Sequence, residues 1–309
     1  MNICVIIVTY NRINLLKECV QCVKDQTYPV SRVIVIDNHS DDGTFEYLEG
    51  LKEQDNRFII RHTVENLGGA GGFALGIRLA KRLDSDWDLI IDDDAMLRSD
   101  YVEKLISYAD EHKEELPVAL SGTVVTDAGI TLNHRRRIGN KLLFLESNVP
   151  EKEYEKDSFS YELATFCGIM VRHDILVEEQ GPLKDFFIWY DDTEYCMRLR
   201  KHGEMANICD AVLDHKTSPE STDSNIFMKT CWKHYYGYRN RFVTVRRHMG
   251  FATWVCVLMQ FVFFLTVSGV MCLIPSLREK GRFNCRMYFD AMKDGTLCRL
   301  GKNDKYLPG

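Results

Sequence analysis

The stretch "LIIDDDAML" (residues 89–97) joins a short apolar run to three consecutive aspartates. The apolar run is typical of a buried strand, whereas adjacent carboxylates repel one another and have low strand propensity. Successive side chains of a strand point to opposite faces, so Asp92 and Asp94 are expected to converge while Asp93 faces the other side. Two convergent carboxylates suit Mg²⁺ or Mn²⁺, whose charge offsets their repulsion. A solvated acidic loop explains many aspartate pairs but not three that directly follow a buried strand, so we predict a metal site.

Apolar runs alternate with helical patterns around this stretch. Strands are expected in "ICVIIVTY", "RVIVIDN", "RFIIRH" and "LIIDDD", with helices between them near residues 14–24, 44–54 and 72–83. Strands that are apolar throughout and alternate with helices are typical of a parallel sheet covered on both faces. Further strands are expected at 117–126, 163–172 and 206–214, with a helix opening near Asp192. The chain is therefore predicted to have an α/β fold with a mostly parallel sheet.

Polar residues gather where the expected strands end, at Thr9 to Arg12, Asp37 to Ser40 and Asp92 to Asp94. In open parallel sheets ligands bind at the carboxyl ends of the strands, so these three groups indicate one site. His215 closes the strand "ANICDAVLDH" at the same kind of position. A single histidine is usually structural, but an imidazole added to two carboxylates would favour Mn²⁺ over Mg²⁺. We predict His215 as a third metal ligand.

A second acidic pair lies in "FFIWYDDTEYCMRL" (residues 186–199). Asp191 with Glu194 resembles a capping box, and acidic residues at a helix start suit the helix dipole. The functional interpretation is that one carboxylate of the pair is anchored while the other faces the site as a general base. The aromatic rings of Trp189 and Tyr190 could form a platform for a sugar ring. At this point either aspartate could be the base.

The glycine-rich stretch "GGAGGFALG" offers a rival hypothesis. Gly69-x-Gly71-x-x-Ala74 fits a relaxed dinucleotide fingerprint, with Asp92 about twenty residues further on, as in an NAD-dependent oxidoreductase. The fingerprint belongs in a tight turn directly after its strand, whereas "TVENL" intervenes here, and one carboxylate rather than three should grip the ribose. The glycines still indicate that the backbone closely approaches a partner such as phosphates or a ribose.

Charge is distributed unevenly over the 309 residues. The net charge of −6 gives no general attraction to nucleic acid, but no Asp or Glu occurs from 224 to 278, where seven Lys and Arg are found. Eleven cysteines lack the spacing of a disulfide framework, and the N-terminus lacks a secretory signal pattern. We expect reduced thiols and a cytosolic location for the acidic part of the chain.

The segment "FATWVCVLMQFVFFLTVSGVMCLI" (residues 251–274) contains 24 residues and no charge. At about 1.5 Å per residue, a helix of this length could span a bilayer, and the alternative is a buried core helix. Basic residues flank both ends, which gives no inside–outside bias and favours a helix or hairpin lying in the cytoplasmic leaflet. We predict a catalytic domain at 1–225 and a basic, apolar helical region at 226–309, which meets the membrane through 226–282. The spanning and interfacial alternatives both stay open.

The motifs "VIIVTYNR", "VIVIDNHSDDGT", "ENLGGAGGF", "IDDDAM" and "IWYDDTEYCMRL", followed by a late histidine, together resemble family 2 inverting glycosyltransferases over residues 3–217. The resemblance implies the GT-A fold, which is Rossmann-like with a mostly parallel sheet and helices on both faces. The versions "NLGGAGGF" and "WYDDTEY" are most similar to bacterial galactofuranosyltransferases, with rhamnosyltransferases next. The resemblance implies transfer of a sugar, expected to be galactofuranose, from a UDP-sugar to a hydroxyl of a lipid-linked or polysaccharide glycan. The alternative donor is dTDP-rhamnose.

The resemblance also implies roles for individual residues. It places Thr9, Arg12 and Asp93 near the nucleotide-sugar, Asp37 and Asn38 by the uracil, and Asn66 and Gly69 by the ribose and diphosphate. Asp92, Asp94 and His215 would hold Mn²⁺ or Mg²⁺. Asp192 would be the base and Asp191 its competitor, because many family members carry Glu-Asp where this chain has Asp-Asp.

The chemistry of such a transfer agrees with these residues. The departing diphosphate needs charge stabilisation, which a metal supplies, and the acceptor hydroxyl needs a base. A direct displacement inverts the anomeric centre without an enzyme nucleophile. Because nucleotide sugars are made in the cytosol, we expect a peripheral or monotopic enzyme at the cytoplasmic face of the cell membrane. The sequence is compatible with an oligomer as well as a monomer.

Overall fold

The computed structural model describes residues 1–216 and 226–307. The chain forms two compact units. The first contains residues 1–137, 147–184 and 192–216, and the second contains 138–146, 185–191 and the described residues from 226 on. The predicted domain boundary at residue 225 lies outside the described residues, and it stays a prediction. Two short segments from before that boundary are grouped with the C-terminal helices.

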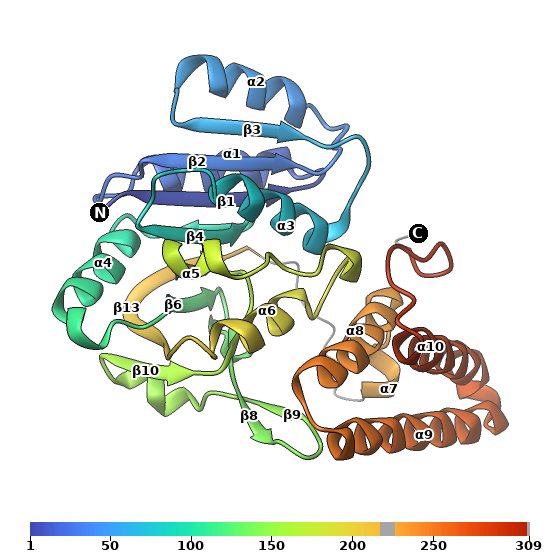
Figure 1. The fold of residues 1–309 in the computed structure, drawn as a ribbon. Coiled ribbons are helices and arrows are strands. Elements are labelled where there is room, and N and C mark those ends of the chain that lie inside the picture. The colour runs from blue at the N-terminus through green and yellow to red at the C-terminus, as the bar shows by residue number, and fades with distance from the viewer. Residues whose placement is uncertain (217–225, 308–309) are drawn as a thin grey trace. The chain divides into compact units, whose positions relative to one another are not determined.

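The first unit is built on a large mixed sheet (Figure 1). Its main strands run in the order β10 (Ser158–Tyr161), β13 (Met205–His215), β6 (Ala119–Thr126), β12 (Ile169–Arg172), β4 (Trp87–Asp92), β1 (Ile3–Thr9), β2 (Arg32–Asp37) and β3 (Phe58–His62). The four strands from β4 to β3 are parallel, and β12 is antiparallel to both of its neighbours. The short strands β5 (Ala95–Leu97) and β7 (Gly129–Ile130) pair with β13 and β6. A small second sheet has the order β11 (Leu163–Ala164), β8 (Arg135–Asn140), β9 (Leu145–Asn148).

Helices cover both faces of the parallel part of this sheet. The helices of the first half are α1 (Ile13–Lys24), α2 (Thr44–Gln54), α3 (Gly68–Ala80), α4 (Tyr101–Glu111), α5 (His173–Glu178) and α6 (Asp191–Leu199). On β1, Val5 and Ile7 belong to the core cluster that contains Leu16 of α1. Val8 and Ile6 of the same strand instead face the glycines of α3. This burial on two faces explains why β1 is apolar throughout, and it confirms the predicted α/β architecture.

Two expectations about local structure are wrong. The strand expected at 163–172 is split into β11 and β12, with Gly168 between them at φ +77°. Helix α3 begins at Gly68, four residues before the helix expected near 72–83, so it includes the whole glycine-rich stretch. A Cβ on Gly72 would lie 2.6 Å from Val8 Cγ1, and one on Gly76 would lie 2.5 Å from Ile6 Cγ2. The fingerprint glycines Gly69 and Gly71 lie in the first turn of this helix, whereas Gly72 and Gly76 make the close contact with β1.

Gly76→Ala is expected to lower the free energy of unfolding by about 1–3 kcal/mol, because the new methyl group overpacks the contact with Ile6. The matched control is Gly50→Ala in α2, where a Cβ would meet no atom within 4 Å. This control is expected to gain up to about 1 kcal/mol from the better helix propensity of alanine. Urea unfolding followed by circular dichroism measures both changes. Equal stability of the two variants would contradict the close packing of α3 on β1.

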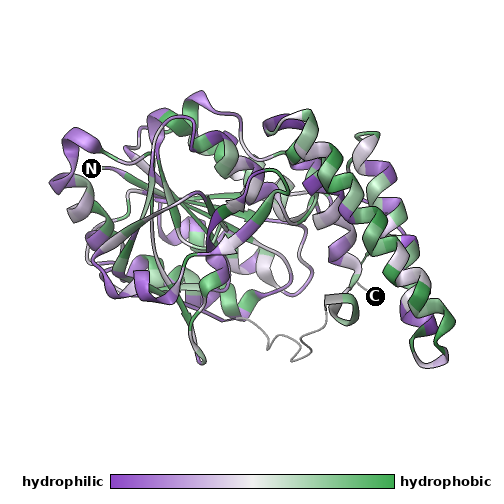
Figure 2. Ribbon diagram, turned by 90° about the horizontal axis from the view of Figure 1, so that it is seen from below, coloured by the Kyte–Doolittle hydropathy of each residue, from purple (hydrophilic) through white to green (hydrophobic). Residues whose placement is uncertain are grey.

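The second unit contains the helices α7 (Ile226–Lys229), α8 (Trp232–His248), α9 (Phe251–Leu273) and α10 (Arg278–Thr296). Helix α10 packs on both α8 and α9. Within the described residues, α9 is long and apolar enough to cross a membrane. Its most apolar stretch of 18 residues has a mean hydropathy of 2.2, and only 22% of that stretch is buried. Its apolar colouring stands out in Figure 2. The low burial disagrees with the alternative of a core helix within this chain.

Candidate active site

The aspartate run begins at the carboxyl end of β4. Asp92 is the last residue of the strand, and Asp93 and Asp94 lie in the turn that leads to β5. The Arg12 guanidinium donates from Nη1 to Asp93 Oδ1 at 3.2 Å and to Asp94 Oδ2 at 2.8 Å. The expectation that Asp93 faces away from its neighbours is therefore wrong, because the chain leaves the strand at Asp92 and the alternation of the pleat ends there.

Asp93 ties the ends of β1 and β4 together. Thr9, the last residue of β1, donates its hydroxyl to Asp93 Oδ2 at 2.7 Å. Only 3% of the Asp93 surface is exposed. This burial raises the pKa of Asp93 to about 6, although the hydrogen bond from Thr9 and the charge of Arg12 oppose the shift. The structure thus brings three of the predicted site residues, Thr9, Arg12 and Asp93, into direct contact.

Asp94 lies beside His215. Strand β13 pairs with β5 so that His215 is opposite Ala95, and its Nε2 is 3.1 Å from Asp94 Oδ1. Burial acts to raise the pKa of Asp94, but the hydrogen bond and charge of His215 and the charge of Arg12 outweigh it and hold the pKa below its usual value. Asp94 is therefore a carboxylate at neutral pH. Of the predicted metal ligands, Asp94 and His215 are in contact. Asp92, the third predicted ligand, precedes Asp94 by two residues in the sequence and is the last residue of β4.

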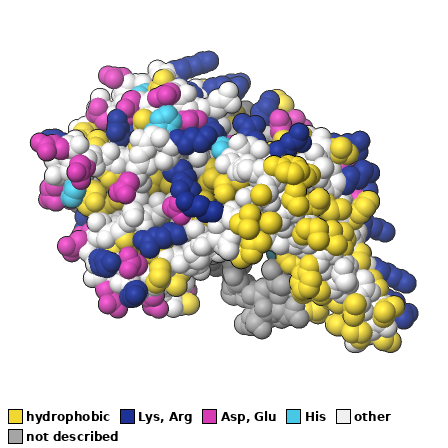
Figure 3. Space-filling view, turned by 60° about the horizontal axis from the view of Figure 1, so that its bottom comes forward, with side chains coloured by type: hydrophobic (Ala, Val, Ile, Leu, Met, Phe, Trp, Pro, Cys, Tyr) yellow, Lys and Arg dark blue, Asp and Glu magenta, His cyan; other side chains and the backbone are white. Residues whose placement is uncertain are grey.

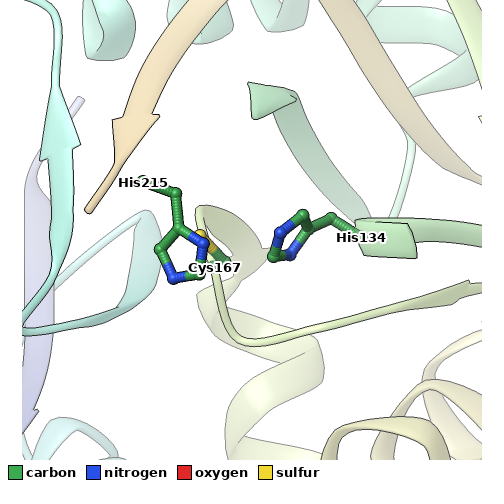
Figure 4. Close-up of side chains that lie close together, drawn as sticks. All are labelled: His134, Cys167 and His215. Carbon is green, nitrogen blue, oxygen red and sulfur yellow. The ribbon is translucent and has the colours of Figure 1, made fainter. Parts of the chain in front are cut away.

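A second group of metal-binding side chains adjoins His215 (Figure 4). The ligand atoms of His134, Cys167 and His215 lie within 4.8 Å of one another. Burial and the nearby charge of Arg135 hold the pKa of His134 well below its usual value, and burial raises that of the Cys167 thiol. Both groups are therefore neutral at pH 7. Sequence reasoning missed them, since neither ends a predicted strand and only the folded sheet brings them beside His215.

The donor atoms at this sheet edge fit a hard divalent cation. Two carboxylates with an imidazole suit Mn²⁺, which accepts nitrogen ligands more readily than Mg²⁺ does. The Arg12 guanidinium forms ion pairs with both Asp93 and Asp94, so these two carboxylates already stabilise a positive charge. Asp94 and His215 are in hydrogen-bond contact, and the set of Asp92, Asp94 and His215 as ligands of the ion stays a prediction.

The residues expected near the nucleotide form a second hydrogen-bonded group at the ends of β2 and β1. Asn38 donates its backbone N–H to Thr9 O at 2.9 Å and its side-chain amide to Asn66 Oδ1 at 3.1 Å. The Asn38 side-chain oxygen accepts from the backbone N–H of Leu67 at 2.9 Å. These bonds fix the chain just before α3. Gly69 lies in the first turn of that helix, and a Cβ there would meet nothing within 4 Å.

Asp37, the last residue of β2, is almost fully buried. Its Oδ2 lies 2.8 Å from His62 Nδ1, and its Oδ1 accepts the backbone N–H of Ser40 at 3.0 Å. The structure thus brings Asp37, Asn38 and Asn66 together next to Thr9. Their expected contacts with uracil and ribose stay predictions.

The second acidic pair stands at the start of α6. Asp191 is buried, whereas Asp192 is partly exposed. Asp192 Oδ1 accepts hydrogen bonds from both the backbone N–H and the hydroxyl of Thr193. Thr193 Oγ1 in turn accepts from Arg136 Nη2 at 3.0 Å. Asp192 belongs to the first unit, whereas Asp191 is grouped with the second unit, as are Trp189 and Tyr190.

Comparison with known proteins agrees with the motifs. The model of the family described as "Glycosyl transferase family 2" matches residues 4–176. Galactofuranosyltransferase GlfT1 of Mycolicibacterium smegmatis is 27% identical over 208 residues, which cover 67% of this chain and 68% of that protein. The dTDP-rhamnosyl transferase RfbF of Shigella flexneri is 25% identical over 255 residues, which cover 80% of this chain and 81% of that protein.

Solved structures resemble the fold at low sequence identity. The crystal structure of GalNAc-T7 with UDP, GalNAc and Mn²⁺ superposes with a TM-score of 0.63 at 11% identity, covering 94% of this chain and 55% of that one. S. aureus TarS 1-349 in complex with UDP superposes with a TM-score of 0.58 at 14% identity, covering 97% of this chain and 91% of that one. These likenesses bear on the fold alone.

Proposed function

The chain belongs to glycosyl transferase family 2, and from that membership we propose that it transfers galactofuranose from a UDP-sugar to a hydroxyl of a lipid-linked or polysaccharide glycan. It is a glycosyltransferase with the GT-A fold, as its motifs predict. The observation that carries the proposal is the contact of Asp94 with His215 and Arg12 at the ends of parallel strands. The NAD-dependent alternative is wrong, because the chain belongs to a family of transferases.

The proposed mechanism assigns a role to each part of the site. Asp92, Asp94 and His215 would hold Mn²⁺ or Mg²⁺, which when bound neutralises the developing charge of the diphosphate. Thr9 fixes Asp93, and Asp93 with Asp94 holds Arg12 at the edge of this site, where its guanidinium can contact a phosphate. Asp192 accepts the proton of the acceptor hydroxyl, whose oxygen bonds to the anomeric carbon as the bond from that carbon to the diphosphate breaks, so UDP leaves and the configuration is inverted.

The choice of donor is tested by offering the full-length protein a panel of UDP-, dTDP- and GDP-sugars with Mn²⁺ and measuring nucleotide release. Release of UDP from UDP-galactofuranose is the expected result, supported by the galactofuranosyltransferase relative. Release of dTDP from dTDP-rhamnose would instead support the alternative that the Shigella relative suggests. If no nucleotide sugar is turned over, the proposed function is wrong.

We further propose that the second unit attaches the enzyme to the cytoplasmic face of the membrane. Figure 3 shows apolar side chains gathered over the C-terminal helices, with Lys and Arg along their border. The large exposed apolar residues of α9 include Phe251, Met259, Val262, Phe263, Val270 and Leu273. Helix α10 begins with Arg278, Lys280 and Arg282. An apolar face bordered by basic residues suits the surface of an anionic bilayer.

The double variant Phe263→Glu and Leu273→Glu is expected to reduce sedimentation with phosphatidylglycerol-containing vesicles by at least about 10²-fold. Each side chain contributes about 1.5–3 kcal/mol when it leaves water, and both are mostly exposed in the chain alone. Val64→Glu is the control, because Val64 is 91% exposed in the first unit. Sedimentation with vesicles is measured for the unsubstituted protein, the double variant and the Val64→Glu control, each at full length. Equal sedimentation of the double variant and the control would contradict membrane attachment through α9.

A further inference from the structure

We propose that Asn240 of α8 is a positioning residue for catalysis, because it holds the segment 185–190 in the shape that leads into Asp191 and Asp192. This inference rests on the proposed function. The C-terminal helices would then have a second role besides membrane attachment: they would fix the rings of Trp189 and Tyr190, which are expected to receive the acceptor. The segment and α8 belong to the same unit.

The backbone of this segment is strained. Phe187, Trp189 and Tyr190 have φ values of 68°, 62° and 70°. These values lie in the left-handed region, which large side chains seldom adopt because the Cβ atom approaches the following carbonyl oxygen. Three such residues among four positions persist only where neighbouring groups hold them, and such strain is found mainly at functional sites. The segment therefore needs an external support.

Asn240 supplies that support with its side-chain amide. Its Nδ2 donates to three backbone carbonyls of the segment, at 3.0 Å to Phe186, 3.2 Å to Ile188 and 2.8 Å to Trp189. The residue is fully buried, so water cannot replace these bonds. Only an amide places two N–H groups on one atom at this length of side chain. An aspartate of the same shape would direct an acceptor at three carbonyl oxygens.

Arg239 extends the same support to the segment's beginning. Its Nη2 donates to Phe186 O at 3.0 Å and to Asp185 O at 3.3 Å, and its Nη1 donates to Gly301 O at 2.6 Å. Its Nε donates to Asn240 Oδ1 at 3.0 Å, which orients the Asn240 amide toward the carbonyls. The two side chains thus form one clamp over 185–189.

Helix α8 also sets the position of the Trp189 ring. The ring meets His234 edge-on, with centroids 5.0 Å apart. Gly237 faces the same ring, and a Cβ there would lie only 3.0 Å from Trp189 Cε3. Trp189 nevertheless remains 40% exposed, as a platform for a ligand requires. Release of the clamp would let this ring and the adjoining start of α6 move, and a displacement of about 1 Å can cost about 10²-fold in rate.

The test compares Asn240→Asp with Asn284→Asp in the full-length protein. Asn284 is a fully buried asparagine of α10 that donates to Phe227 O at 2.9 Å, so it controls for loss of a buried amide in the same unit. Three quantities are measured: acrylamide quenching of Trp189 fluorescence, as the difference from each protein's Trp189→Phe version; affinity for UDP with Mn²⁺; and release of UDP from UDP-galactofuranose. Asn240→Asp is expected to increase the quenching and to lower kcat by about 10–10²-fold while the UDP affinity changes less than about twofold.

A second variant, Gly237→Ala, distinguishes a displaced Trp189 from a general loss of folding. Gly237→Ala keeps every bond of the clamp and favours the helix, but its methyl group presses on Trp189. It is expected to change the Trp189 quenching and lower kcat without weakening UDP binding. The proposal is overturned if Asn240→Asp leaves quenching and kcat unchanged, or if Asn284→Asp alters both equally. If the unsubstituted protein turns over no UDP-galactofuranose, the donor proposal fails, and the quenching comparison still decides whether Asn240 positions the segment.

Discussion

Asp94→Asn is expected to lower Mn²⁺-dependent turnover of the UDP-sugar by at least about 10³-fold. The Asp94 carboxylate contacts both His215 and Arg12, and it is the predicted ligand whose ionised state the surrounding charges favour most clearly. A neutral amide keeps the shape but removes the charge on which metal binding depends. Stabilisation of a departing diphosphate by a metal is worth several kcal/mol, and each 1.36 kcal/mol is about tenfold in rate.

The measurement is UDP release as a function of Mn²⁺ concentration, with the thermal unfolding midpoint recorded to show that the variant is folded. Asp214→Asn is the matched control, because Asp214 lies next to His215 on β13 but pairs with Arg98 at the surface. The control should retain nearly full activity. Undiminished activity of the unsubstituted protein in EDTA would show that the metal assignment is wrong.

Asp192→Asn is expected to lower kcat by about 10²–10⁴-fold, which is the usual contribution of a positioned general base. Affinity for UDP with Mn²⁺ should change little, because the base contacts the acceptor. Asp192 is partly exposed, and its Oδ1 accepts hydrogen bonds from the backbone N–H and the hydroxyl of Thr193, which fix the carboxylate at the start of α6. Stopped assays with saturating donor measure kcat, and calorimetry measures UDP binding.

Asp191→Asn is the informative comparison. Asp191 is buried at the start of α6, where removing its charge is expected to affect stability more than the proton transfer. The assignment within the pair is reversed if Asp191→Asn binds UDP normally yet shows the larger loss of turnover.

Much of the fold follows from short-range patterns. The parallel strands β1, β2 and β4 are mainly apolar because both faces are covered, and their ends coincide with the polar groups that the sequence singles out. Helix α2 has the bounds expected for it, and α1 differs by one residue. Periodicity reports burial directly, so these elements could be predicted without knowledge of their neighbours.

The details of the site depend on where regular structure stops. Alternation along a strand predicts Asp93 on the opposite side from Asp94, but the turn after Asp92 brings both to Arg12. The contact of His134 and Cys167 with His215 depends on tertiary structure alone. The left-handed backbone at Trp189 and Tyr190 contradicts the preference of those residue types. No local pattern contains such information, because each feature is imposed by a partner distant in the sequence.

The grouping of 185–191 with helices that follow it in the sequence has a consequence for biosynthesis. The N-terminal part of the chain leaves the ribosome first, so the strands that end at Thr9, Asp37 and Asp92 can pair before α8 and α10 have been made. Asn240 and Arg239 reach the carbonyls of Phe186 and Trp189 only after α8 emerges. If the proposed roles hold, a nascent or prematurely terminated chain would contain the residues proposed to bind the nucleotide, while its segment 185–190 would still lack the hydrogen bonds from α8.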